Sequence, residues 1–63
     1  MDGERAQLSS VATGLDDLVD RVEATAKRVQ DHGREDLASD LYEVERSLEA
    51  ARRRLNGVLR DLR

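Results

Sequence analysis

The stretch VQDHGREDL, residues 29–37, decides the fold, because one long helical pattern stops there and a second one starts. Gly33 is its only strong helix breaker, and it suits the left-handed position just after a helix end, where a side chain would add strain. Glu35 and Asp36 then place negative charge in the first turn of a following helix, which the helix dipole favours. A connection this short requires the two flanking helices to run antiparallel.

Apolar residues recur at alternating spacings of three and four on both sides of this turn. Before it they are Leu8, Val11, Leu15, Leu18, Val22 and Val29, with Thr25 at the one missing step; after it they are Leu37, Leu41, Val44, Leu48, Ala51, Leu55, Val58 and Leu62. This spacing is the heptad repeat of a left-handed coiled coil and not the alternation of a strand. It predicts an all-α chain that forms a single domain over residues 1–63. We expect a helix over about 4–31, a turn over about 32–34 and a helix over about 35–62.

The two apolar patterns fit together about Gly33. If Leu8 is labelled a and Leu37 is labelled d, each a residue of one helix faces a d residue of the other, from Val29 opposite Leu37 to Leu8 opposite Val58. The charges agree with this alignment, because the basic end of the second helix lies beside acidic residues of the first. Each exposed pair contributes at most ~1 kcal/mol, but the arrangement disfavours a parallel alternative. We therefore predict an antiparallel coiled-coil hairpin.

Composition limits what such a hairpin does alone. A chain of 63 residues is near the lower size limit for independent folding, and without cysteine it has neither disulfides nor a cysteine-based zinc site. Small chains of this kind turn to oligomerisation or to very regular helix packing. Since no more than two apolar residues stand in a row, we expect neither a transmembrane span nor a secretory signal, and a cytoplasmic location.

The e positions of the heptad predict where a second hairpin docks. They carry small and apolar residues, interrupted by Glu45 and Arg52, while the g positions are mostly polar. We therefore expect the e flank to pack on another copy as a four-helix bundle. The predicted interface residues are Ala12, Val19, Ala26, Ala38 and Leu59. The alternative is that alanine is simply a good helix former and that Val19 and Leu59 are isolated surface residues.

The sequence shows no catalytic, metal-binding or cofactor-binding constellation. His32 is the only histidine, and a helix-terminal, partly exposed role suits it better than catalysis or metal binding. The Glu-x-x-His motif of bundle di-metal sites is absent, because Val29 stands three residues before His32. There is no Gly-rich phosphate loop, and no serine has a base beside it in the sequence. We expect no enzymatic activity, no cofactor and no small-molecule substrate.

A basic stripe on the second helix indicates a different class of function. Arg46, Arg53 and Arg60 repeat every seven residues, about 10 Å apart along one helix face, as a contact line for phosphates would. Against this, Glu43 and Glu49 lie within one turn, the net charge is −3, and no aromatic stack is available. Nucleic-acid binding is therefore the second hypothesis.

The overall plan resembles the plasmid copy-control hairpins of the Rop type, which dimerise into four-helix bundles and bind paired RNA loops. The similarity is one of length and layout. The basic RNA-binding face of that family has no counterpart on the first helix, which carries Asp16, Asp17, Asp20 and Glu23, so no site residue is carried over.

The first hypothesis is a non-catalytic structural or interaction module that associates with itself or with a helical protein partner. A basic composition dominated by arginine is associated with bacteria of high genomic GC content. A third hypothesis is a small regulator that folds on binding a helical partner.

Overall fold

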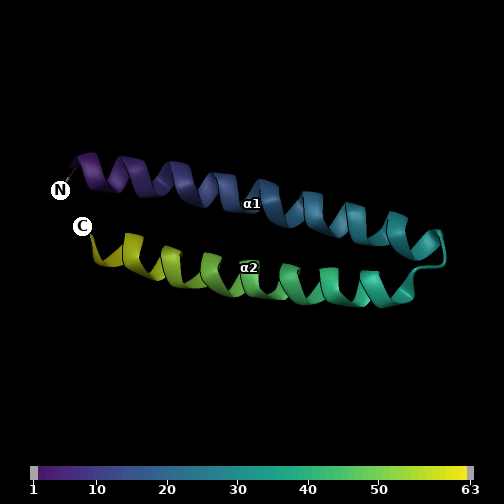
Figure 1. Cartoon of the computed structure of the whole chain (residues 1–63). Helices are drawn as coiled ribbons and strands as arrows, with labels where there is room; N and C mark the ends of the chain where they lie inside the picture. The colour runs from purple at the N-terminus through teal and green to yellow at the C-terminus, as the bar shows by residue number, and fades with distance from the viewer. Residues whose placement is uncertain (1, 63) are drawn as a thin grey trace.

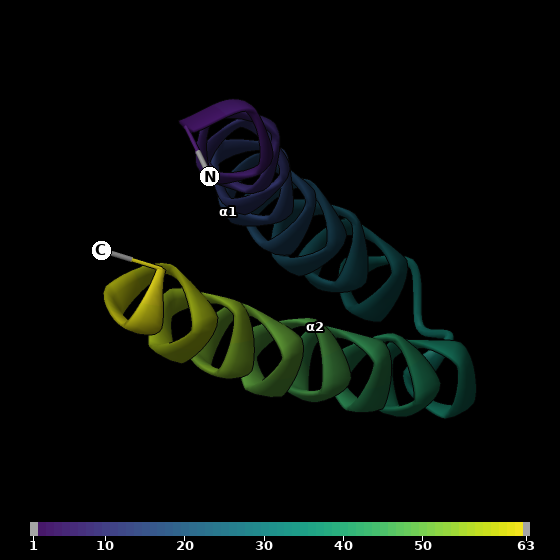
Figure 2. The same ribbon diagram turned by 90° about the vertical axis from the view of Figure 1, so that its left-hand side faces the viewer.

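The computed structural model describes residues 2–62, which form an antiparallel hairpin of two long helices (Figure 1). Helix α1 spans Asp2–Asp31 and helix α2 spans Glu35–Asp61, close to the predicted ranges. The start of α1 and the end of α2 lie at the same end of the hairpin, opposite the turn, and Figure 2 shows the two helices side by side with no third layer on either of them. The hairpin is 48 Å long and 14 Å wide between Cα atoms.

The turn ends α1 with a glycine and two backbone hydrogen bonds. Gly33 has a φ of 83°, the left-handed conformation predicted from the sequence. Its N–H donates to the carbonyl of Gln30 over 2.9 Å, and the N–H of Arg34 donates to the carbonyl of Val29 over 3.2 Å. These are the two bonds of a Schellman motif, which satisfies carbonyls at the helix end that no further turn would reach.

Gly33→Ala should destabilise the hairpin by about 1–2 kcal/mol, the cost of holding a side chain in the left-handed conformation. Gly57→Ala is the matched control, because a Cβ there meets only the Arg60 Nη2 atom, at an ordinary 3.8 Å. We expect this control to stabilise α2 by about 0.5–1 kcal/mol. Urea unfolding followed by circular dichroism measures both changes, and a Gly33→Ala protein as stable as the parent would contradict the account of the turn.

Helix α2 begins with an ion pair instead of a side-chain cap. The Arg34 guanidinium donates to both carboxylate oxygens of Asp36, from Nε and Nη2, each over 3.3 Å. Together with the backbone N–H of Leu37, this contact lowers the pKa of Asp36 below its ordinary value of 3.8. A carboxylate whose pKa is lowered on folding adds stability above its unfolded pKa and loses it as the pH falls through its folded pKa. The negative charge also lies in the first turn of α2, as predicted.

The apolar seam between the helices differs from the predicted one by a rotation of each helix. The buried residues are Val19, Ala26 and Ala38, at 6%, 0% and 2% exposure, and all three occupy e positions. The other apolar seam members are half-buried: the a residues Leu8, Leu15, Val22, Val29, Leu41, Leu48, Leu55 and Leu62, and the e residues Ala12 and Leu59. The hairpin therefore closes through its a and e positions, and the predicted pairing of a with d residues is wrong.

Side-chain size and polarity explain this choice of seam. Ala26 and Ala38 lie within two turns of the connection and are almost fully buried, and a methyl group fits there without overpacking. The alternative seam would bury Thr25, whose hydroxyl instead donates to the Arg21 carbonyl over 2.9 Å on the exposed surface.

Candidate protein-interaction face

The rotation of the seam leaves the large d residues in solvent. Val11 is 52% exposed, Leu18 43%, Leu37 42%, Val44 46% and Val58 46%. We call these five residues the open face. A contiguous apolar surface of this kind is typical of a protein-interaction site, whereas isolated surface leucines and valines are common and carry no such meaning.

Both helices contribute to the same open face. In a heptad the d position lies on one fixed side of the a and e positions, in the same rotational sense on each helix. Reversing the direction of the second helix then places its d line on the same side of the hairpin as the d line of the first. The open face consequently runs along the hairpin on both helices, beside the half-buried a residues.

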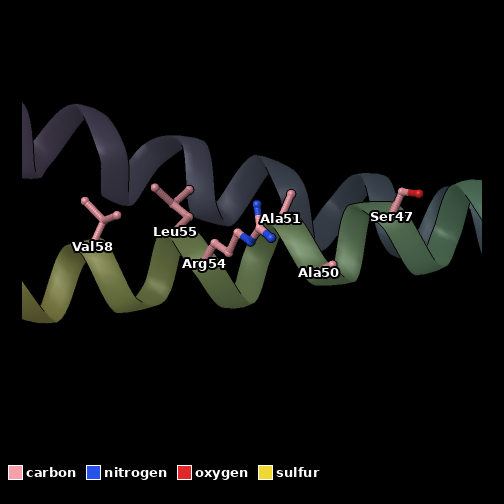
Figure 3. A pocket seen from close by; sticks show the side chains of 6 residues that line it. All are labelled: Ser47, Ala50, Ala51, Arg54, Leu55 and Val58. Carbon is pink, nitrogen blue, oxygen red and sulfur yellow. The ribbon is translucent and has the colours of Figure 1, made fainter.

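A shallow groove lies on the α2 half of this face, near the chain ends. It is lined by Ser47, Ala50, Ala51, Arg54, Leu55 and Val58. Figure 3 shows Ala51, Leu55 and Val58 pointing to the same side of α2. Small residues at 50 and 51 leave space between the larger ones, as in a surface that receives side chains from another helix.

The opposite edge of the seam is closed by polar contacts between the helices. The Tyr42 hydroxyl donates to Oε1 of Gln30 over 3.2 Å, and Nη1 of Arg52 donates to Oδ1 of Asp16 over 3.0 Å. Within residues 2–62 these are the side-chain hydrogen bonds that join α1 to α2, and neither involves the open face. One edge of the hairpin is thus polar and closed, and the other is apolar and open.

Glu45 occupies an e position in the seam, where it and Arg52 are the charged residues of α2 among the small and apolar Ala38 and Leu59. Partial burial raises its pKa above the ordinary 4.5, and the nearby carboxylates of Glu23 and Glu49 raise it further, while Lys27 acts in the opposite direction. A carboxyl group whose pKa is raised on folding binds its proton more tightly in the folded state. Ionised Glu45 therefore destabilises the hairpin at neutral pH.

Glu45→Gln should raise the midpoint of thermal unfolding at pH 7, because it removes the charge and keeps the size of the side chain. At pH 3 the carboxyl is protonated in both states, so the gain should disappear. The stability of the parent relative to the variant should rise as the pH falls through the raised pKa of Glu45 and then below the ordinary 4.5. Thermal unfolding followed by circular dichroism at pH 3, 5 and 7 tests this. An equal effect of the substitution at all three pH values would show that charge is not the cause.

The predicted oligomer interface lies mostly inside the hairpin. Val19, Ala26 and Ala38 are buried between α1 and α2, while Ala12 and Leu59 are half-buried in the same seam. The prediction of an outer flank is wrong for Val19, Ala26 and Ala38, because these three side chains are already buried within their own hairpin. The apolar residues that are exposed in their place are the d residues of the same heptad.

The predicted arginine stripe lies on α2 away from the open face. Arg46, Arg53 and Arg60 are all exposed, and Nη2 of Arg46 donates to Oε1 of Glu43 over 2.6 Å. This ion pair offsets the charge of one of the three arginines. The stripe is present as a line of side chains, but one of its members is engaged within the helix.

His32, beside the turn, has no arrangement of neighbours among residues 2–62 that suits catalysis or metal binding. His32 is exposed, and its Nδ1 lies 2.6 Å from the Arg28 carbonyl, where a protonated Nδ1 donates to the end of α1. In the part of the chain that the structure describes, no group of three or more His, Asp or Glu side chains converges as metal ligands would. Over the same residues, neither helix combines the length and the apolar character needed to cross a bilayer.

Comparison of the chain with family models, with curated proteins and with solved structures finds no match in any of the three. The fold and the face described above define the class: an antiparallel two-helix hairpin with one apolar, solvent-exposed side.

Proposed function

We propose that this hairpin is a non-catalytic protein–protein interaction module that self-associates through its open face. One observation carries the proposal: the large apolar d residues of both helices are 42–52% exposed, whereas the seam buries only Val19, Ala26 and Ala38. The hairpin therefore buries only two alanines and one valine, while five leucines and valines at d positions stay more than two fifths exposed. A second copy placed on the open face would complete a four-helix core.

The size of the face suits a stable dimer. The hairpin measures 48 by 14 Å between Cα atoms, and the area of a face with these sides is of the same order as the ~800 Å² that each partner buries in a specific interface. No large side chain among residues 2–62 is fully buried in the single hairpin. Chains of this size without disulfides or metals commonly gain the missing stability by oligomerisation.

Light scattering coupled to size-exclusion chromatography, over about 1–200 µM with circular dichroism on the same samples, tests the proposal. We expect a mass of twice the 7.1 kDa monomer and high helicity that falls, together with the mass, at low concentration. A helical monomer at every concentration would contradict self-association and would assign the open face to a different helical partner. A monomer of low helicity would favour a chain that folds on binding that partner.

A further inference from the structure

We infer that the second copy docks with both turns at the same end of the dimer, so that α1 of one copy lies against α2 of the other. This inference rests on the proposed self-association and specifies its geometry. Two arrangements bring the open faces together in a closed two-fold dimer: turns at the same end, or turns at opposite ends. They differ in which side chains meet along the rims of the face.

The rims of the open face are the g positions, which lie just outside the d lines on each helix. On α1 they are Gln7, Gly14, Arg21 and Arg28, and on α2 they are Asp40, Ser47, Arg54 and Asp61. All are exposed. The 3.0 Å contact between Asp16 and Arg52 and the 3.2 Å contact between Gln30 and Tyr42 set the level of α1 against α2 to within about one helical turn, and the first of them lies nearer the middle of the hairpin. Counting from it, Arg28 is level with Asp40, Arg21 with Ser47, Gly14 with Arg54, and Gln7 with Asp61.

With the turns at the same end, residues that are level within one hairpin meet across the dimer. Arg28 then meets Asp40 of the second copy, and the two-fold axis repeats this ion pair on the other side. Arg54 meets Gly14, where no heavy atom lies within 4 Å of a Cβ position, so the long arginine stem has room to lie along α1. No pair of like charges faces another across either rim.

With the turns at opposite ends, α1 lies against α1 and α2 against α2. Asp40 then faces Asp61 of the second copy on both sides of the two-fold axis, and Arg28 faces the neutral Gln7. Like charges in direct opposition disfavour an arrangement, whereas complementary ones fix its orientation. The rim charges therefore favour the same-end dimer.

The apolar side chains of the open face agree with the charges. In the same-end dimer the large Leu18 lies against the small Ala51 of the second copy, and Val11 lies against Val58. In the opposite-end dimer Leu18 meets Leu18 and Ala51 meets Ala51, which crowds one layer and leaves space in another. Large residues opposite small ones fill a core at the density of a protein interior, so the same-end dimer fits better.

Crosslinking of single-cysteine variants tests this arrangement. The chain has no cysteine of its own, so each variant carries one reactive thiol. Arg28→Cys and Asp40→Cys are mixed, unfolded, refolded together and treated with a short bismaleimide. The matched mixture is Asp40→Cys with Asp61→Cys, and each variant alone is the control. Intact mass spectrometry distinguishes the heterodimer of Arg28→Cys with Asp40→Cys from the homodimers. The two Asp→Cys variants have equal masses, so tryptic peptide mapping identifies their crosslinks, and light scattering on the untreated parent shows whether it is a dimer.

We expect at least about tenfold more crosslinked heterodimer from the Arg28→Cys and Asp40→Cys mixture than from the matched mixture. In the opposite-end dimer positions 28 and 40 would be about 30 Å apart along the axis, beyond the reach of the reagent. Arg21→Cys mixed with Ser47→Cys tests the same geometry if Arg28→Cys does not fold. Suppose the parent is a dimer, but the variants crosslink through positions 40 and 61, or neither the 28/40 nor the 21/47 mixture gives a crosslink. Either result overturns this inference but leaves self-association intact. A monomeric parent overturns both.

Discussion

Leu18→Glu should convert the dimer into a monomer, with a dissociation constant raised by about a thousandfold or more. Leu18 is 43% exposed in the single hairpin and lies near the centre of the open face. In the dimer its replacement would bury two carboxylates, one from each copy, without partners, and an unpaired buried charge costs several kcal/mol. A factor of one thousand in affinity corresponds to about 4 kcal/mol, which two such groups readily supply.

Ala24→Glu is the matched control, because it adds the same charge to the same helix at an exposed position outside the open face. We expect it to leave the mass unchanged in light scattering from about 1 to 200 µM. If Leu18→Glu remained a dimer across that range, the open face would not be the interface. If both variants became monomers, net charge and not the location of the glutamate would be responsible.

Val19→Glu, one residue further along, should unfold the hairpin itself. Val19 is only 6% exposed and lies in the seam, so the new carboxylate would be buried between α1 and α2. The expected cost is about 3–5 kcal/mol, comparable with the entire stability of a domain this small. Far-ultraviolet circular dichroism at 25 °C should therefore show loss of most of the helical signal, at every protein concentration.

The two adjacent substitutions together distinguish the two possible seams. With the seam at a and e, Leu18→Glu breaks the assembly and Val19→Glu breaks the fold. With a seam at a and d the effects would be exchanged, because Leu18 would then be in the core and Val19 on the outer flank. Helicity of the Leu18→Glu monomer, measured at the highest concentration, separates lost assembly from lost folding.

The heptad spacing and Gly33 are enough, from the sequence alone, to define the number of helices, the position of the turn and the antiparallel direction. These features depend on local chemistry: the periodicity of apolar residues along each helix, and the left-handed conformation, which a glycine adopts without strain. The negative charge in the first turn of α2 is also a local feature that the sequence predicts, because its effect depends only on the dipole of that helix.

Which apolar side faces inward was decided only by the tertiary structure. Both helices carry apolar residues at a, d and e, so one sequence is compatible with a seam on either side of the a line. The choice depends on how two surfaces fit together, as the near-complete burial of the small side chains of Ala26 and Ala38 shows. Such a fit belongs to the pair of helices, whereas periodicity is a property of each helix alone. The d residues of the open face are exposed because the two helices pack through their a and e positions.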